Sequence, residues 1–167
     1  MNHEESKLQQ ACVSWFRAQY PQYAMLLVHP INEGSGHAPI DRRRQGIHKA
    51  EGAVAGVPDL ILFMPTVNEY WLDGKAFVLP QNGAGFEFKT SKGSQSQAQK
   101  DYEKIFVSAG YFYKVIRCFE EFKKIVNEYI SVVPTDYRQR IAATHVEIVQ
   151  AAEQREKEKF YKIIGKK

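Results

Sequence analysis

Apolar residues recur along the first 130 residues with two different periods, and each period has the length expected of elements in a globular domain. Spacings of three and four residues predict helices over residues 4–19 and 119–130, and over a third stretch from Ser96 to residue 109. Short apolar runs predict strands over residues 23–29, 57–64, 67–72, 75–79, 86–90 and 111–117. This order predicts an α/β fold with a central mixed sheet flanked by helices.

Turn and cap residues mark the ends of several of these elements. The clearest signals are Asp73-Gly74 for a hairpin turn, Ser96 with Gln99 for a capping box, and Gly110 for a helix C-terminus. Residues 31–55 are polar and contain several glycines, which predicts a long loop, with a helical turn around residues 39–50 as an option. Loops of this length inside a compact domain are usually functional or disordered.

A helical extension follows the predicted core. Pro134 interrupts the pattern, and residues 137–163 then predict one long helix with a stripe made of Ile141, His145, Ile148 and Ala152. We therefore divide the chain into a domain over residues 1–130 and a C-terminal extension over residues 131–167. The extension has three interpretations: a dimer interface, a helix that lies on DNA, or a helix packed on the core. The second is suggested by lysines near its end, namely Lys157, Lys159, Lys162, Lys166 and Lys167.

The composition is that of an ordinary globular protein with a formal net charge of +4, a mild bias compatible with a polyanionic partner. No apolar run reaches membrane-spanning length, and the first residues carry acid where a signal peptide carries positive charge. We therefore expect a cytoplasmic protein, of a bacterium or a phage-infected host cell, with no membrane association. Cys12 and Cys118 are expected to be buried free thiols. The histidines lack a metal-ligand spacing, so no zinc site is expected.

An acid in an apolar segment is the first candidate for chemistry. Asp59 lies in the predicted strand that starts at Val57, and it shares a face with Ile61 and Phe63. A carboxylate there is costly unless it ends the strand, is paired, or binds a metal. The structural interpretation is an end-of-strand residue that binds turn amides. We favour a functional one because a second acidic segment follows.

That second segment is Phe86-Glu87-Phe88-Lys89, in which alternation places the two aromatic rings on one face and Glu87 and Lys89 on the other. The alternative is the solvated face of an edge strand. Two carboxylates held about 4 Å apart repel by roughly 4 kcal/mol at an effective dielectric near 20, and a divalent cation would offset this. Asp59 and Glu87 are then metal ligands, with the Phe88 carbonyl as a further oxygen ligand. Lys89 would position the attacking water or stabilise the developing charge, which is the minimal equipment for metal-assisted phosphodiester hydrolysis.

Other residues are weaker candidates when taken alone. Glu5 is explained as a first-turn acid that favours the helix dipole, and Gln99 as the capping box itself. A basic cluster in the long loop is interpreted equally well as a solvated loop and as a phosphate-binding segment. The DNA-binding candidates are Arg42, Arg43, Arg44, Lys49, Lys92 and Ser96.

Taken together, these residues resemble the VRR-NUC family of the PD-(D/E)XK nuclease superfamily, over residues 4–127, in a stand-alone form like that of phages or mobile elements. The matching pieces are Glu5-x-x-Leu8-Gln9, Asn32-Glu33-Gly34, Gly56-x-Pro58-Asp59-Leu60, Glu87-Phe88-Lys89, Gly93-x-x-Ser96-x-x-Gln99 and Gly110. The hairpin between Asp59 and Glu87 is longer than the family minimum, and the tail from residue 131 lies outside the resemblance.

The resemblance implies a restriction-endonuclease-like core, dependence on Mg²⁺ or Mn²⁺, and cleavage of branched DNA of the Holliday-junction or flap type, leaving a 5′ phosphate. It maps Glu5, Asp59 and Glu87 to the acidic positions, Lys89 to the catalytic lysine and Gln99 to the active-site glutamine. Glu5 would serve a second ion or a bound water. Small stand-alone members of this kind suggest a homodimer.

Two other functions are compatible with the same residues. One is a catalytically inactive nucleic-acid-binding protein on a nuclease scaffold. The other is a restriction-type nuclease that reads a short sequence, which the lack of a distinct recognition module disfavours.

Overall fold

The computed structural model describes residues 3–30, 50–72 and 75–164 of the 167-residue chain. The chain divides into two compact units, Met1–Val133 and Pro134–Lys167. Most of the long polar loop lies outside the described residues, including the predicted helical turn and the basic cluster within it.

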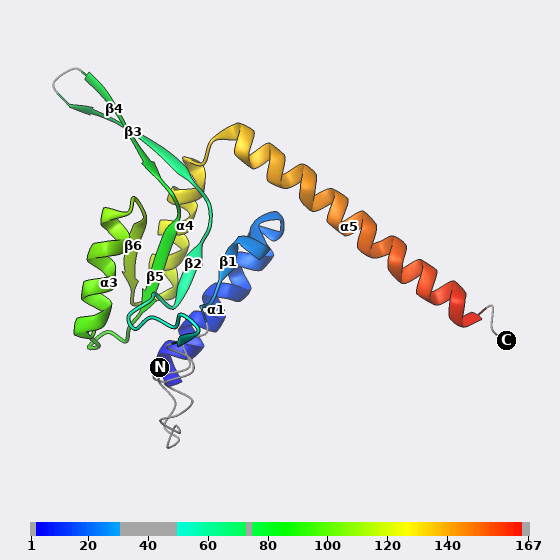
Figure 1. Ribbon diagram of the computed structural model, residues 1–167, viewed down its shortest axis with the longest axis horizontal. Helices are drawn as coiled ribbons and strands as arrows, with labels where there is room; N and C mark the ends of the chain where they lie inside the picture. Colours follow the sequence, from blue (N-terminus) through cyan, green and yellow to red (C-terminus); the bar gives the residue numbers. More distant parts are fainter. Residues whose placement is uncertain (1–2, 31–49, 73–74, 165–167) are drawn as a thin grey trace. The chain divides into compact units, whose positions relative to one another are not determined.

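The first unit is built on a four-stranded sheet with the order β1-β2-β5-β6 (Figure 1). Its strands are β1 (Leu27–Val28), β2 (Leu60–Leu62), β5 (Ala84–Phe88) and β6 (Phe112–Ile116). The pairs β1–β2 and β2–β5 are antiparallel, and β5–β6 is parallel. The predicted mixed sheet is therefore confirmed. Because β5 has a partner on each side, the edge-strand interpretation of its acidic residue is wrong.

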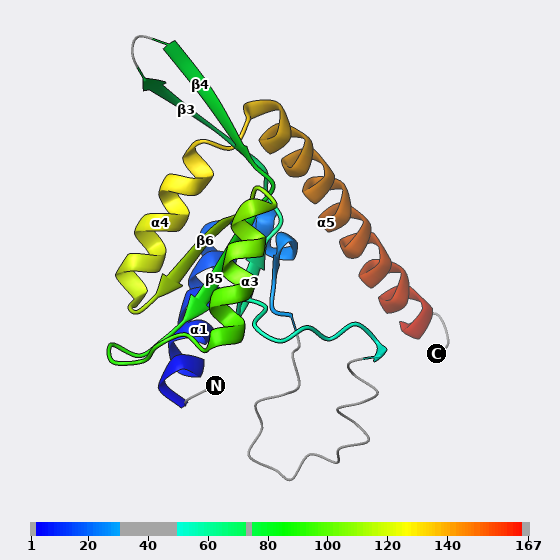
Figure 2. The ribbon, with the colours of Figure 1, turned by 60° about the vertical axis from the view of Figure 1, so that its left-hand side comes forward.

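Helices cover both faces of this sheet. On one face, the rings of Phe86 and Phe88 lie 5.2 and 6.0 Å from that of Phe122 in α4 (Phe119–Ser131). Trp15 of α1 (His3–Gln19) packs against the same Phe122 ring at 6.0 Å. On the other face, α3 (Gln97–Ser108) contributes Phe106 to a buried cluster with residues of β2 and β6. Figure 2 shows the sheet between α3 and the pair α1 and α4.

The predicted strand over residues 23–29 is wrong for most of its length. Residues Pro21–Leu26 form a 3₁₀ helix, η1, and only Leu27–Val28 pair as a strand. The physical reason is Pro21, which occupies the first turn, where its fixed φ and missing N–H favour a helical start. Met25 is 77% exposed, so the apolar run is not a buried strand.

Two other strands differ from the predicted limits in ways that matter for the site. The strand predicted over residues 57–64 is reduced to Leu60–Leu62, so Asp59 lies just before it rather than inside it. The strand predicted over residues 86–90 starts at Ala84 and ends at Phe88. Lys89 continues its direction, since its N–H donates to the Ile116 carbonyl at 3.0 Å.

The hairpin and the cap signals are confirmed. Strands β3 (Thr66–Leu72) and β4 (Lys75–Gln81) form a separate antiparallel sheet, although their Asp73-Gly74 turn lies outside the described residues. Ser96 and Gln99 form the capping box of α3, and Gly110 follows that helix with a φ of +81°. Cys12 is buried as expected, but Cys118, the residue directly before α4, is exposed, so that part of the expectation is wrong.

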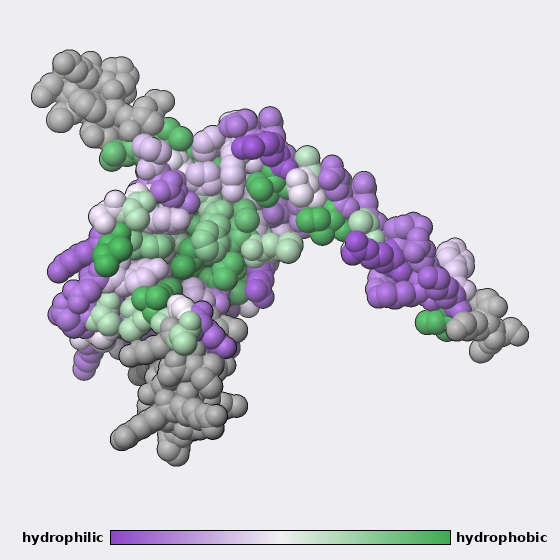
Figure 3. Space-filling view, in the orientation of Figure 1, coloured by the Kyte–Doolittle hydropathy of each residue, from purple (hydrophilic) through white to green (hydrophobic). Residues whose placement is uncertain are grey.

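The second unit consists of one 30-residue helix, α5 (Thr135–Ile164), which is about 45 Å long at the usual rise per residue. Its apolar side chains are largely exposed (Figure 3). They include Val146, Ile148 and Val149, with exposed fractions of 52%, 49% and 41%. In the part of the chain that is described, no helix combines the length and apolar character needed to span a bilayer.

Gly56 determines how the chain approaches β2. Its φ is +88°, and a Cβ at this position would lie 2.2 Å from the carbonyl oxygen of Ala98 in the first turn of α3. The backbone before Asp59 therefore runs directly against this turn, which also contains Gln99. Only glycine permits both the positive φ and the close approach.

We expect Gly56→Ala to reduce the free energy of unfolding more than Gly52→Ala does. Gly52 also has a positive φ, of +98°, but a Cβ there meets nothing within 4 Å. Both substitutions therefore incur roughly 1–2 kcal/mol of backbone strain, and Gly56→Ala adds about 1–3 kcal/mol for the steric overlap. Urea denaturation of the two variants measures the difference. Equal midpoints would show that the segment can move away from α3 without cost.

Candidate metal-binding active site

Asp59 lies directly before β2 begins, beside the last residues of β5. Its Oδ2 accepts a hydrogen bond from the backbone N–H of Phe88 at 2.7 Å. Its own backbone carbonyl accepts one from Nδ1 of His29 at 2.6 Å. Binding an amide is what the structural interpretation of Asp59 predicted, but the amide belongs to the neighbouring strand that also carries Glu87. The carboxylate is thus directed at the second acidic segment.

Glu87 lies on β5, an inner strand of the sheet, and is fully buried. Its Oε1 accepts hydrogen bonds from Nζ of Lys89, at 2.6 Å, and from Nε2 of Gln99. Its Oε2 is buried and has no hydrogen-bond partner among the described residues. Buried carboxylate oxygens are normally satisfied, because desolvation without a partner is costly. This unsatisfied oxygen is a suitable ligand for a cation.

Asp59 perturbs the carboxyl group of Glu87, and both groups have raised pKa values. Burial is the largest effect on Glu87, and the charge of Asp59 and a hydrogen bond between the two carboxyl side chains add to it, so the pKa of Glu87 is raised to about 7 despite the opposing effect of Lys89. Burial also raises the pKa of Asp59, against the hydrogen bond from Phe88 and the positive charges of Lys89 and His29. When both groups are ionised, the site carries uncompensated negative charge that a divalent cation would stabilise.

The backbone of β5 offers a third oxygen. In a strand, the N–H and C=O of one residue point to the same side. The N–H of Phe88 points at Asp59, whereas that of Lys89 points at β6. The Phe88 carbonyl is therefore directed toward Asp59. Two carboxylates and a carbonyl form an all-oxygen donor set that fits Mg²⁺ or Mn²⁺, hard cations that take oxygen ligands.

The donor set needs water to complete it. Among the residues that the structure describes, no three side chains of histidine, cysteine, aspartate or glutamate converge to hold a metal by themselves. Mg²⁺ commonly binds through one or two carboxylates and keeps several waters, so two carboxylates suffice for this ion. A site with bound water is also what hydrolysis requires.

Gln99 caps its helix and also contacts Glu87. Its Oε1 accepts a hydrogen bond from the N–H of Ser96 at 2.8 Å, which completes the capping box. Its Nε2 reaches Oε1 of Glu87. The cap thereby fixes the orientation of the amide, and the amide fixes which oxygen of Glu87 remains unsatisfied. The hydroxyl of Ser96, a predicted DNA contact, is occupied as the acceptor of the Gln99 N–H at 3.3 Å.

Glu5 supports the loop that follows Lys89. Its Oε1 accepts the backbone N–H of Thr90 at 3.2 Å, and its charge contributes to the raised pKa of Asp59. Nη1 of Arg117 holds the same loop from another side, by donating to the carbonyls of Thr90 and Gly93 at 2.6 and 2.8 Å.

Only some of the candidate DNA contacts lie in the described part of the chain. Lys92 is exposed in the loop that Glu5 and Arg117 hold. The remaining basic candidates, Arg42, Arg43, Arg44 and Lys49, lie outside the described residues.

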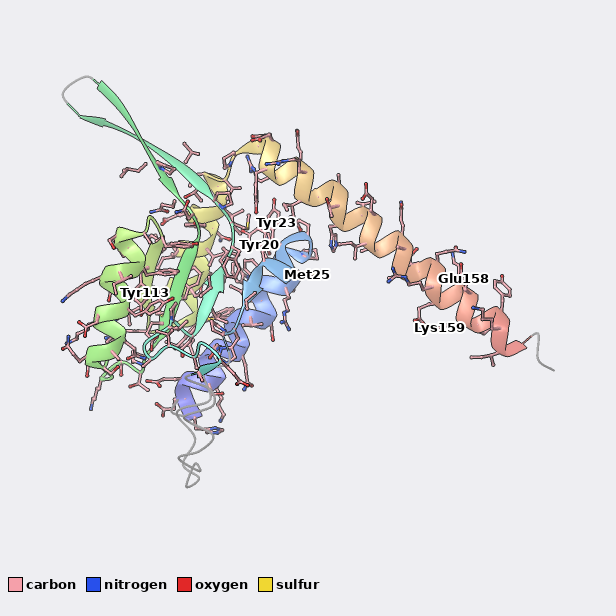
Figure 4. The ribbon with its side chains drawn as sticks, in the orientation of Figure 1. Tyr20, Tyr23, Met25, Tyr113, Glu158 and Lys159 are labelled. Atoms are coloured by element: carbon pink, nitrogen blue, oxygen red, sulfur yellow. The ribbon has the colours of Figure 1, made fainter. Side chains whose placement is uncertain are left out.

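No site role is predicted for His29 or Tyr113 from the sequence, and Gln9 enters the family resemblance without one. His29 contacts the Asp59 carbonyl, and Gln9 is a buried polar residue at an apolar position of α1, which is a further signal for it. Tyr113 of β6 points toward α3 (Figure 4). Burial and then the charge of Glu87 raise the pKa of Tyr113, so its hydroxyl lies within electrostatic reach of the carboxylates.

No family model matches the sequence, and no curated protein matches it either. Among solved structures, the chain is similar to one named a VRR_NUC domain protein, with 18% identity and a TM-score of 0.60. The match covers 80% of this chain and 93% of that chain. The protein therefore shares the fold of that VRR_NUC domain protein, an α/β fold with a restriction-endonuclease-like core.

In the absence of metal, we expect the free energy of unfolding to fall as pH rises from about 5 to 8. Glu87 has a pKa of about 7 in the folded chain and near its ordinary 4.5 when unfolded, so between these values the folded state binds more protons. The slope is at most about 1.4 kcal/mol per pH unit for this group. Chemical denaturation across this range, with chelator present, measures it.

Glu87→Gln is the matched control, because it keeps the shape and removes the titration. We expect its stability to vary less steeply over the same range, although the raised pKa of Asp59 contributes in the same direction. Identical slopes for the wild type and the variant would contradict the raised pKa.

Proposed function

We propose that this protein is a divalent-metal-dependent DNA endonuclease of the VRR-NUC family. The observation that carries the proposal is the buried, unsatisfied Oε2 of Glu87 beside Asp59, with Lys89 bound to the other oxygen of the same carboxylate. The Lys89 ion pair and the Gln99 amide both use Oε1, so Oε2 remains for a cation. The fold shared with a VRR_NUC domain protein supports the same conclusion.

Asp59, Glu87 and the Phe88 carbonyl would hold the ion. When bound, Mg²⁺ or Mn²⁺ supplies Lewis acidity and lowers the pKa of a coordinated water. Lys89 would orient the attacking water or stabilise charge on the phosphorus centre through its ammonium group. Its side chain is only 12% exposed, so it acts in a poorly screened environment. The water oxygen would form the new bond to phosphorus in line and give up a proton to solvent. The bond to the 3′ oxygen would break, and that oxygen would take up a proton from solvent, which leaves a 3′ hydroxyl and a 5′ phosphate.

Glu5 and Gln99 act on the geometry of this centre. Gln99 holds Oε1 of Glu87, which leaves Oε2 for the ion. Glu5 holds the Thr90 amide and so fixes the loop that begins directly after Lys89. A second ion or a water bound near Glu5 is the finer role that the family resemblance suggests for this residue.

DNA is the proposed substrate, and branched DNA of the junction or flap type is the finer proposal from the family resemblance. Lys92, in the loop after the catalytic segment, would contact phosphate, together with the basic residues of the long loop. Binding through several such contacts would weaken steeply with salt.

A homodimer would present two such sites to the two strands of a branched substrate. We propose α5 as the interface, because Val146, Ile148 and Val149 are exposed on one helix that forms a unit of its own. An isolated helix of this composition gains stability mainly by packing an apolar face, and a second copy would provide that packing.

We expect Lys89→Ala to reduce DNA cleavage by about 100-fold or more, the size found when a donor to a developing oxyanion is lost. The assay is a panel of duplex, single-stranded, flap and four-way DNA with Mg²⁺ or Mn²⁺, at enzyme excess, and with chelator as the blank. Lys104→Ala is the matched control. This lysine of α3 is exposed, and its ion pair with Asp101, at 3.9 Å, is on the surface of the same helix.

The same panel separates the rival functions. Binding without cleavage of any substrate would favour an inactive scaffold, and cutting of plain duplex at a fixed sequence would favour a restriction-type enzyme. Undiminished cutting by Lys89→Ala would reject the proposed mechanism.

The α5 interface is tested by Ile148→Glu, which places charge on the exposed apolar surface. We expect the wild type to be a dimer and the variant a monomer by light scattering, because burying an unpaired carboxylate at an interface is strongly unfavourable. Glu147→Gln, at the adjacent position, should remain dimeric. A monomeric wild type, or a dimer that survives Ile148→Glu, would refute this interface.

A further inference from the structure

His29 is bound to the backbone of Asp59 by one defined nitrogen. Its Nδ1 lies 2.6 Å from the Asp59 carbonyl oxygen. A carbonyl oxygen only accepts hydrogen bonds, so Nδ1 must carry the proton. The contact therefore fixes the tautomer of neutral His29 as the Nδ1–H form and leaves Nε2 unprotonated.

Gln9 approaches the same carbonyl from α1. Its Nε2 is 3.4 Å from the Asp59 oxygen and 3.2 Å from Nδ1 of His29. Because the proton on Nδ1 is already directed at the carbonyl, the amide of Gln9 serves as a second donor to that oxygen, which has two lone pairs. Gln9 is 8% exposed, so it is one of the few buried polar residues in the described part of the chain.

These contacts lie where the sheet itself provides none. The pairing of β2 with β5 begins at Leu60, one residue after Asp59. The backbone of Asp59 therefore depends on side-chain contacts to fix its position. Three residues earlier in the chain, Gly56 lies against the first turn of α3. The carboxylate is bound by the Phe88 amide, and the carbonyl is bound by His29 and Gln9, so the residue is fixed at both ends.

We propose that His29 is a positioning residue for the metal site, and that its Nδ1–H sets the affinity for the divalent ion by fixing the backbone of Asp59. The inference rests on the proposed function, because it assumes that Asp59 is a ligand. It makes no use of charge on the ring, so it predicts that any side chain with a donor in the place of Nδ1 replaces histidine.

Substitution of His29 by asparagine or by glutamine tests which of its two ring nitrogens matters. The amide nitrogen of asparagine lies at the same number of bonds from Cα as Nδ1, and that of glutamine at the same number as Nε2. We expect His29→Asn to bind Mn²⁺ within about twofold of the wild type, and His29→Gln and His29→Ala to bind it at least about fivefold more weakly. Calorimetric titration of metal-free protein with Mn²⁺ alone measures this, and His3→Gln, an exposed position of α1, is the control.

Melting in chelator shows whether each variant is folded before metal is added. A purely structural role predicts that metal affinity follows the loss of melting temperature, whatever the side chain. The positioning role predicts that asparagine restores affinity and glutamine does not. Equal Mn²⁺ affinity for the Asn and Gln variants, or a Gln variant that binds like the wild type, would overturn it.

The tautomer gives a second test that needs no metal. We expect the ¹⁵N spectrum of the His29 ring in metal-free wild type to show Nδ1 protonated and Nε2 unprotonated at alkaline pH, and the reverse assignment would overturn the inference.

A wild type that binds no Mn²⁺ would refute the proposed function and the inference together. A wild type that binds Mn²⁺ no better than His29→Gln would refute the role of His29 alone.

Discussion

The electrostatic repulsion between Asp59 and Glu87 is the constraint on which the arrangement of this domain depends. Burial raises the pKa of both carboxyls, and each is affected by the charge of another acid in the site. At about 4 Å and an effective dielectric near 20, such a pair costs roughly 4 kcal/mol. The fold compensates with Lys89, Gln99 and one backbone amide, and these contacts satisfy some of the carboxylate oxygens while leaving Oε2 of Glu87 without a partner.

The strand lengths create this proximity. Because β2 is only three residues long, Asp59 falls outside its ladder, where its side chain can turn toward β5 instead of alternating across the sheet. β5 continues past that point, so Glu87 is flanked by Asp59 on one side and by β6 on the other.

The sequence allowed much of this to be predicted, and the failures have physical causes. Alternation correctly separated Phe86 and Phe88 from Glu87, because strand geometry fixes which side chains share a face. It could not show that α3 covers the face of Glu87, since coverage depends on tertiary packing. The contact of His29 with Asp59 was equally out of reach, because it joins residues 30 positions apart through a single ring nitrogen.

The N-terminus of α3 connects the fold to the chemistry. Gly56 lets the Asp59 segment pass against the first turn of this helix, and Gln99 of the same turn donates to Glu87. The positive end of the helix dipole lies at this turn, so it favours the ionised carboxylate that a metal requires. The capping box therefore stabilises the helix and orients the amide that selects one oxygen of Glu87. A helix start that is ordinary in sequence becomes part of the site because both acidic segments converge on it.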